Sequence, residues 1–515
     1  MKSGTFKRLF SFILALTLFI SASATALASD PTAELDSEAP VAVDSAPADV
    51  DPQPLAVDST APAAVDSQPT VVDSAPPQVE ITDIYSSWAE EDVFMAQDVY
   101  NLGNAGTYSN FLGDLTVAKF MPVLESLAAA LKSDIDFQPA DDNVLLTRGE
   151  VVTILYGVLT GINTEDDYES LEYFIDAGLI YGRSPDDYQL LEICTVEEMI
   201  ALSNRVYNHG IYEAGNYSTG FFWEVDGVSN KVYLLGSIHL SDYSIYPMSK
   251  PIEVAFARSD NLVVEADISD MGEDAIAFIT KIGFYDPTSG ETIADYISEE
   301  TYAQYIEVFE SLGIPEDVYS TFKPWMAYNY LTSLLMSEGD QQTLIDNTGS
   351  GIDMYFLLKA GDAEKNILQL ESIESQITMM SSFSDELQEM LLSEVLSVAL
   401  GSDEEDESEE EEQAQAEDLS TLLQEALKAM KTGDEAAIIE LFGIDAETDD
   451  PLSIEYNQKM MTERDAAMAE KIAGYLEEET NSGDYFIVVG AAHLLSKKSV
   501  IAQLSDMGYE VERIK

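Results

Sequence analysis

Cysteine and basic residues are the scarcest features of this chain. Its 515 residues include a single cysteine, Cys194, so no disulfide can form within the molecule, and packed cores or a metal must hold it together. Lysine and arginine number 24 against 96 aspartates and glutamates, which gives a net charge of −72. This charge argues against binding to nucleic acid or to an anionic membrane, and it predicts a highly soluble exported protein.

Several common catalytic motifs are missing as well. The sequence contains no Gly-x-Ser-x-Gly elbow, no P-loop and no His-Glu-x-x-His helix. Serine hydrolase, nucleotide-binding and zincin functions therefore lack support. What is present is an apolar fraction of 46%, enough for large cores in a chain long enough for two or three domains.

The N-terminus has the pattern of a secretory signal, predicted for residues 1–28. Basic residues precede an apolar run from Leu9 to Ile20, and Ala26–Ala28 forms a cleavage site. The run is too short to span a bilayer, so we expect no transmembrane helix in the mature chain; an uncleaved anchor is the alternative. Residues 29–80 repeat Val-Asp-Ser among Pro and Ala, which predicts a semi-rigid, solvated spacer.

Residues 81–210 have a globular, helical composition with a weak internal repeat. In its second and third copies, Thr147 and Thr195 precede apolar-periodic helices, with Glu150 and Glu198 three residues later, as a capping box requires. The segment resembles S-layer homology repeats, which implies binding to a cell-wall polymer and a location at the wall. The alternative is a helical spacer that binds nothing.

Residues 215–515 change to strands at both ends with helices between them. Runs at 220–225, 232–235 and 261–266 predict strands, and strands return at 366–370, 485–489 and 509–513. We expect the first and last runs to share one sheet. The fold class predicted is therefore an α/β (α+β) C-terminal domain with a mixed central sheet and a large helical insertion, after an all-α N-terminal repeat domain.

Like charges dominate residues 402–418 within that helical region. The acidic side chains repel one another and offer no apolar face, so this stretch is predicted to be a disordered surface loop rather than a calcium site. His209 precedes the strands and is expected in an exposed linker.

Two of the three histidines share one sequence context. His239 and His493 each end a Gly-x-x-His motif that follows an apolar strand. We expect Gly236 and Gly490 either to adopt backbone angles that alanine avoids or to lie against an ion. Neutral imidazoles and a carboxylate on rigid elements suit a metal, and Glu265, at the end of another apolar strand, is costly to bury without a cation or donors. His239, His493 and Glu265 are thus the candidate site; structural histidines are the alternative.

The order of these fragments resembles the TraB/GumN family, which includes the Tiki proteins and is similar to the ChaN-like proteins. The resemblance covers about residues 215–515 and rests on the following segments: Phe222–Val225, Gly236–His239, Leu262–Asp267, Lys323–Trp325, Gly351–Asp353, Leu370–Ser372, Arg464–Asp465 and Gly490–His493. It implies that Asp353 is a further metal ligand and that Glu371 acts at the site. Arg464 is expected to pair with a carboxylate or to orient a substrate.

These observations favour a secreted metal-dependent hydrolase. The Tiki resemblance implies a peptide or protein substrate, with Glu265, Arg464 and Glu371 as catalytic residues and His239, His493, Glu265 and Asp353 as metal ligands. Imidazole and carboxylate donors together accept Mn, Co or Zn. The alternative is a non-catalytic cell-surface module that binds a metal or a small ligand, as the ChaN-like resemblance implies.

Overall fold

The computed structural model describes residues 85–515 apart from 90–91, 94, 97–99, 101, 104–107, 109, 136, 163–166, 183–186, 240, 242, 268–272, 337–350, 401–408 and 479–482. The predicted signal (1–28) and spacer (29–80) lie outside the described residues. None of the described helices is both long and apolar enough to cross a membrane.

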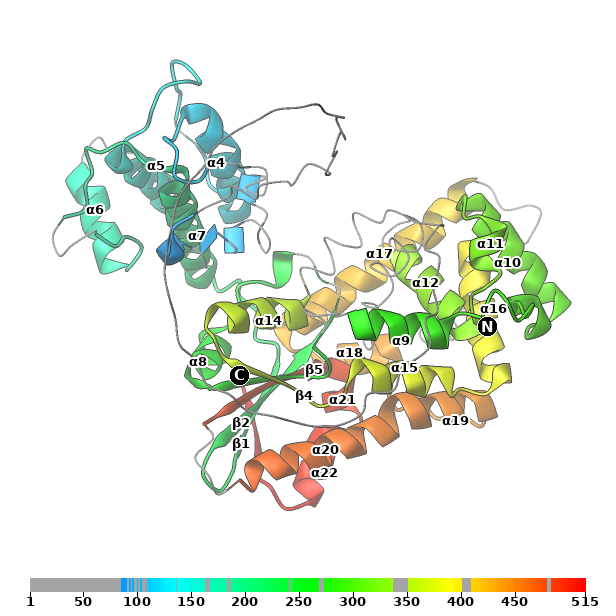
Figure 1. Cartoon of the computed structure of the whole chain (residues 1–515). Coiled ribbons are helices and arrows are strands. Elements are labelled where there is room, and N and C mark those ends of the chain that lie inside the picture. Colours follow the sequence, from blue (N-terminus) through cyan, green and yellow to red (C-terminus); the bar gives the residue numbers. More distant parts are fainter. Residues whose placement is uncertain are drawn as a thin grey trace, which may run out of the picture.

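The first helices form a group of their own at the upper left of Figure 1. They are η1 (Ser87–Ala89), α4 (Val117–Leu131), α5 (Arg148–Thr160), α6 (Asp167–Asp176) and α7 (Val196–Glu213). The two predicted capping boxes, at the starts of α5 and α7, are both present. His209 was wrongly expected in a linker: it lies within α7 and its Nε2 is 3.2 Å from the Tyr173 hydroxyl.

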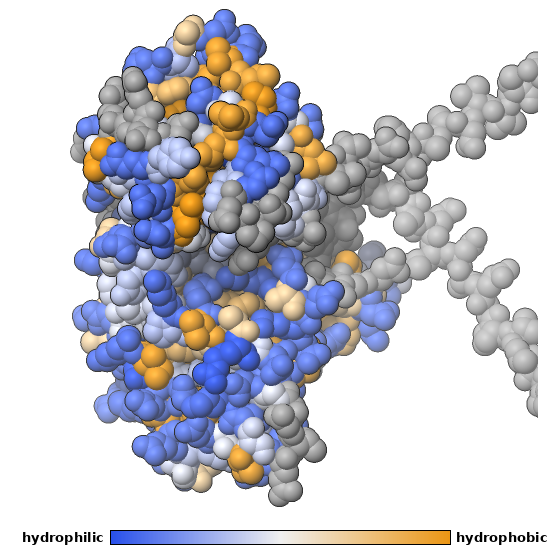
Figure 2. All heavy atoms as spheres, turned by 90° about the vertical axis from the view of Figure 1, so that its left-hand side faces the viewer, coloured by the Kyte–Doolittle hydropathy of each residue, from blue (hydrophilic) through white to orange (hydrophobic). Residues whose placement is uncertain are grey.

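The predicted repeat copies meet through their backbones just before α4, α5 and α7. Leu115 N–H donates to Cys194 O, Cys194 N–H donates to Leu146 O, and Leu146 N–H donates to Leu115 O, at 2.8–3.1 Å. The three segments thus close a ring of hydrogen bonds. Hydrophobic side chains gather over this part of the molecule, in the upper half of Figure 2. Exposed examples are Leu112, Val144, Leu145 and Leu191.

A mixed sheet follows, as the sequence predicted. It has six strands in the order β4-β3-β5-β2-β1-β6. Its strands are β1 (Phe221–Asp226), β2 (Lys231–Ser237), β3 (Asn261–Val264), β4 (Asn366–Gln369), β5 (Tyr485–Gly490) and β6 (Val511–Ile514). β2 and β5 pair in parallel, so the two ends of the domain share one sheet. All six residues of β5 are buried, which explains its continuous apolar sequence.

Helices fill the chain between the strands, and those with buried side chains within residues 279–331, 373–396 and 456–460 pack around a second apolar core. This group lies on the right of Figure 1. Those before β4 are η4 (Tyr243–Ile245), α8 (Lys250–Arg258), α9 (Glu273–Gly283), η5 (Ile293–Asp295), α10 (Glu299–Ser311), α11 (Glu316–Tyr319), α12 (Pro324–Met336) and α14 (Ile352–Asp362). After β4 come α15 (Ile373–Ser381), α16 (Asp385–Ala399), α17 (Glu409–Thr432), α18 (Glu435–Phe442), α19 (Pro451–Asn457), the π-helical turn η6 (Gln458–Thr462), α20 (Glu463–Leu476), α21 (Ala491–Leu495) and α22 (Val500–Asp506).

The acidic segment differs from the expectation in its second half. α17 begins at Glu409, so the stretch from there to residue 418 is helical rather than a disordered loop. Glu, Gln and Ala are strong helix formers, and their propensity outweighs the repulsion between like charges here. Residues 401–408 lie outside the described residues.

Candidate functional site

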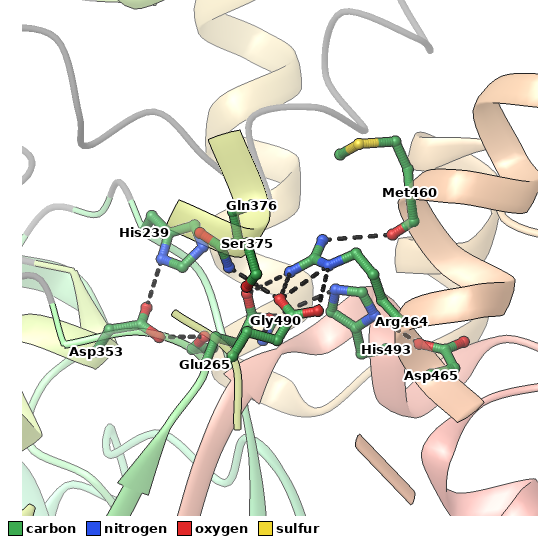
Figure 3. Close-up of polar contacts among 12 residues, drawn as sticks. His239, Glu265, Asp353, Ser375, Gln376, Met460, Arg464, Asp465, Gly490 and His493 are labelled. Atoms are coloured by element: carbon green, nitrogen blue, oxygen red, sulfur yellow. Dashed lines mark hydrogen bonds and ion pairs between the residues drawn. The ribbon is translucent and has the colours of Figure 1, made fainter. Parts of the chain in front are cut away.

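Parallel strands bring the candidate site to one edge of the sheet. β2, β5, β3 and β4 run in the same direction, and Ser237 of β2 pairs with Gly490 of β5. The carboxyl ends of parallel strands meet at a common edge. His239 and Glu265 follow β2 and β3 at this edge, and Glu371 follows β4. Figure 3 shows His239, Glu265 and His493 gathered there, as the sequence predicted.

The His239 imidazole is held by a carboxylate from α14. His239 Nδ1 donates to Asp353 Oδ2 at 2.8 Å, and Ser237 Oγ donates to Asp353 Oδ1 at 2.9 Å. Gly351 makes this contact possible: a Cβ at that position would lie 2.2 Å from the His239 carbonyl oxygen. The Gly-Ile-Asp segment therefore lets α14 start directly against the histidine turn.

The His493 imidazole is held in the same way by a different helix. His493 Nδ1 donates to Asp465 Oδ1 at 2.6 Å, and Ser496 Oγ lies 3.4 Å from Asp465 Oδ2. His493 is 1% exposed and Asp465 is fully buried. Each histidine thus has its own aspartate on Nδ1, and this pairing fixes which ring nitrogen carries the hydrogen.

Glu265 lies between a backbone donor and a buried arginine. Its Oε1 accepts from Gly490 N–H at 2.8 Å and lies 3.5 Å from His493 Nε2. Its Oε2 accepts from Arg464 Nη2 at 3.0 Å. The sequence predicted that this buried carboxylate would need a cation or hydrogen-bond donors, and Arg464 and the Gly490 N–H provide them.

Arg464 joins Glu265 to Glu371. Its Nε and Nη2 donate to the Glu371 carboxylate at 2.7–3.1 Å, and Nη1 donates to Met460 O at 3.3 Å. Gln376 Nε2 also donates to Glu371, at 3.0 Å. The side chain of Arg464 is only 5% exposed. All three guanidinium nitrogens are therefore used within the protein.

Burial and charge shift the pKa values of these groups in opposite directions. Burial opposes protonation of His239, but the charge of Asp353 and its hydrogen bond outweigh it and raise the pKa of the imidazole. Burial would raise the pKa of Asp353, yet His239 and Ser237 lower it. Burial likewise opposes ionisation of Glu371, and the charge of Arg464 lowers its pKa below the ordinary value. At Asp465 burial dominates and raises the pKa.

The outer nitrogens of both imidazoles remain available. His239 Nε2 and His493 Nε2 are buried and make no hydrogen bond to any residue that the structure describes. A neutral histidine whose Nδ1–H is fixed by a carboxylate presents a lone pair on Nε2, which is the arrangement of metal-ligating histidines. The residues present therefore fit a divalent ion. As their side chains stand, no group of three His, Cys, Asp or Glu among the described residues is arranged to hold one.

Sequence reasoning missed the roles of Ser237 and Asp465 and the close approach of the backbone at Gly351. Asp465 had a signal, because an Arg-Asp pair next to a helix start contains two charges that cannot both be buried without partners. The structure places Asp353 beside His239 Nδ1, with both carboxylate oxygens in use. Asp267 N–H donates to Gln369 Oε1, at the adjoining strand end.

The two motif glycines do not have the expected backbone angles. Neither Gly236 nor Gly490 has a positive φ, and Gly490 has φ −49° and ψ 134°. Gly236 is instead needed for packing: a Cβ there would lie 3.0 Å from Phe221 Cβ and 3.2 Å from Ala491 Cα.

At one edge of the mixed sheet lie two imidazoles, each bound to an aspartate, and a glutamate bound to an arginine. The chain is therefore an α/β protein with a buried cluster of ionisable side chains. The chain belongs to the TraB/PrgY/gumN family, whose model matches residues 221–513. Over 153 residues it is 26% identical to the uncharacterized protein YbaP of Escherichia coli K12, covering 30% of this chain and 53% of YbaP. The matched stretch thus spans about half of that relative.

A second relative is an uncharacterized protein of Treponema pallidum. It is 24% identical over 280 residues, which are 54% of this chain and 78% of that protein. No solved structure gives a significant match to the chain.

Proposed function

We propose that this chain is a metal-dependent hydrolase acting on peptides. The observation that carries the proposal is the pair of buried Nε2 atoms, each on a histidine whose Nδ1 is bound to an aspartate. Two such buried atoms with no hydrogen-bond partner in the described part of the chain are costly unless a ligand completes them. The peptide substrate rests on the resemblance to the Tiki-like members of the family.

His239 and His493 would hold the ion through Nε2, and Glu265 would be a third ligand or the general base. Each carboxylate oxygen has a second lone pair, so the bonds from Gly490 and Arg464 leave Glu265 able to bind further. A divalent Mn, Co or Zn ion bound here supplies a Lewis acid that acidifies water and polarises a carbonyl group.

The remaining side chains position these three. Asp353 and Asp465 fix the tautomer and orientation of the imidazoles. Arg464 and the Gly490 N–H hold the two oxygens of Glu265, so that Oε1 stays 3.5 Å from His493 Nε2. From that position Glu265 can accept a proton from a water molecule attacking a peptide carbonyl. Glu371 neutralises and orients Arg464, and its part in the reaction is indirect.

A second function is favoured by one observation. Arg464 forms a buried ion pair with Glu265, which offsets the charge of the proposed base. A site whose glutamate is already paired with an arginine suits binding of a metal or small ligand without turnover. This is the non-catalytic cell-surface module.

Peptide cleavage distinguishes the two functions. The purified full chain is stripped of metal, reloaded with Mn²⁺, Co²⁺ or Zn²⁺ and incubated with a peptide library. Glu265→Gln is compared with Glu310→Gln, an exposed position on α10. We expect metal-dependent cleavage by the wild type and Glu310→Gln, and none by Glu265→Gln. Tight metal binding with no cleavage by any of them would favour the binding module, and equal cleavage by metal-free protein would contradict the metal requirement.

We also propose export, from the signal pattern in residues 1–28, and association with a cell-wall polymer through residues 81–210. Against wall binding stands Arg148 of the Thr-Arg-x-Glu segment, whose Nη1 is bound to Glu198 and Nη2 to Tyr181 O. N-terminal sequencing of the secreted protein should begin at Ser29. Protein in the cell fraction that retains Met1 would contradict export. If the protein does not sediment with purified cell walls, wall binding fails and the helices are a spacer.

A further inference from the structure

A cavity of about 330 Å³ lies against the His493 side of the site. It is bounded by the connection after α18, by α19 and η6, and by the start of α20 and α21. Its walls are mainly apolar side chains, buried or half-buried: Phe442, Ile444, Tyr456, Met460 and Met461. A cavity of this kind inside a chain of net charge −72 is suited to an uncharged occupant.

The floor of the cavity is part of the site. Asp465, the partner of His493 Nδ1, lines it, and so do Ala492, directly before His493, and Ser496, three residues after it. Ser496 Oγ lies 3.4 Å from Asp465 Oδ2. An occupant would therefore lie against α20 and α21, the helices that carry Asp465 and His493.

Part of the cavity wall is an irregular helical turn just before Asp465. η6 (Gln458–Thr462) is a π-helix inserted between α19 and α20, and it supplies Met460 and Met461 to the cavity. Arg464 and Asp465 follow two and three residues after it, and Met460 O accepts from Arg464 Nη1. Single π-turns inside helices are frequent at functional sites. Methionine side chains adapt their shape to different occupants.

The size and chemistry of the cavity select its occupant. Its volume is at the lower limit of small-molecule pockets, about 300–1,000 Å³. Its exposed rim has both signs of charge, with Asp445 and Glu447 beside Lys497 and Lys498. The rim therefore selects for neither sign of charge, and the walls select for one large apolar group.

We propose that this cavity is a specificity pocket that receives a large apolar side chain, such as phenylalanine or leucine, of the peptide substrate. The role as a specificity pocket rests on the proposed hydrolase function. Binding of the apolar group itself does not, because it needs only the cavity.

Filling the cavity tests the proposal. Ile444→Trp puts a larger side chain into the wall, and Ile454→Trp makes the same change on α19 at a position that is 51% exposed. Met461→Trp serves as a second filling variant if Ile444→Trp unfolds. Binding of N-acetyl-phenylalaninamide and N-acetyl-alaninamide is measured by saturation-transfer NMR on metal-free full chain, so this measurement needs no turnover.

We expect the phenylalanine amide to bind the wild type and Ile454→Trp at least ~10-fold more tightly than the alanine amide, and a filling variant to lose this preference. In cleavage assays, wild-type kcat/KM should favour Phe over Ala at the selected position by about 10- to 100-fold, again lost on filling. Equal binding of both amides by the wild type, or a preference that survives filling, would overturn the pocket. If no chain cleaves any peptide, the hydrolase function fails and the binding result alone decides what the cavity accepts.

Discussion

The two histidines of the site reach the same arrangement from different local structures. His239 follows β2 in a non-helical turn and takes its aspartate from α14, 114 residues away. His493 lies within the short helix α21 and takes its aspartate from α20, 28 residues away. His493 Nε2 lies 3.5 Å from Glu265, whereas the described side chains of His239 and Glu265 form no such pair.

This difference indicates that the surroundings of His239 and those of His493 have different roles in the site. Both imidazoles are prepared alike on Nδ1, so both suit metal ligation. Of the two histidines, only His493 has a short contact, among the described residues, to the network of Glu265, Arg464 and Glu371, and α20 provides both Arg464 and Asp465. His239 with Asp353 is therefore a metal-ligand position only, whereas His493 with Asp465 and α20 also positions the carboxylates.

The largest effect is expected from breaking the arginine network. Arg464→Met leaves two buried carboxylates without their cation, which should lower the free energy of unfolding by about 3–5 kcal/mol at neutral pH. Arg258→Met is the control, since its ion pair with Asp484 is long at 3.8 Å and largely exposed. It should cost less than about 1 kcal/mol. Urea unfolding of both variants measures the difference, and equal losses would mean that Arg464 is not the network's cation.

Removing each aspartate's charge compares the two halves directly. Asp353→Asn and Asp465→Asn should each weaken divalent-metal affinity by roughly 10- to 100-fold, because both orient a ligating imidazole. Titration calorimetry with Zn²⁺ on folded variants gives the values. A loss confined to one variant would show that only that histidine binds the ion.

The acid response of the network sharpens the comparison further. The pKa of Glu371 is below its ordinary 4.5, so Glu371 contributes stability that is complete above that pH and is lost as the pH falls through the folded pKa. Glu371→Gln should therefore be less stable than the wild type by about 1–3 kcal/mol at pH 7, and the gap should shrink below pH ~4.5. Unfolding measured across pH checks this, and a gap that does not change with pH would contradict the assignment.

An effect no larger than that of Glu371→Gln is expected at the strand end before His239. Gly236→Ala adds a Cβ that contacts Phe221 and Ala491 at 3.0–3.2 Å, so overpacking should cost about 1–3 kcal/mol. Gly361→Ala, in α14 with nothing within 4 Å of the new atom, is the matched control and should stabilise by up to about 1 kcal/mol. Thermal melting compares the two. A Gly236→Ala protein as stable as Gly361→Ala would show that the strand end tolerates a side chain.

Much of the sheet could be predicted because strand periodicity and burial are local properties of the sequence. The first and last groups of strands share one sheet, as predicted, and the pairing of β2 with β5 within it brings His239 and His493 to one edge. The aspartate partners could not be predicted in this way. Their contacts depend on where α14 and α20 pack, and no periodicity in the sequence encodes that.

The errors have similar physical causes. Of the two alternatives for the glycines, unusual backbone angles and a position against an ion, the first is wrong, and Gly236 is required by tertiary contacts with a neighbouring strand and helix. His209 was placed in a linker because Asn-His-Gly resembles a turn, yet packing against Tyr173 keeps it within α7. Tertiary packing outweighed local propensity in both cases.

The number of metal ions bound per chain tests the central claim most directly. Titration calorimetry with Mn²⁺, Co²⁺ and Zn²⁺ is done on the wild type, His239→Ala, His493→Ala and the double variant, each shown to be folded by circular dichroism. If both Nε2 atoms bind one ion, the wild type binds one ion per chain, either single substitution abolishes tight binding, and the double variant loses no more than the singles. Equal metal binding by all four proteins would contradict the shared metal site.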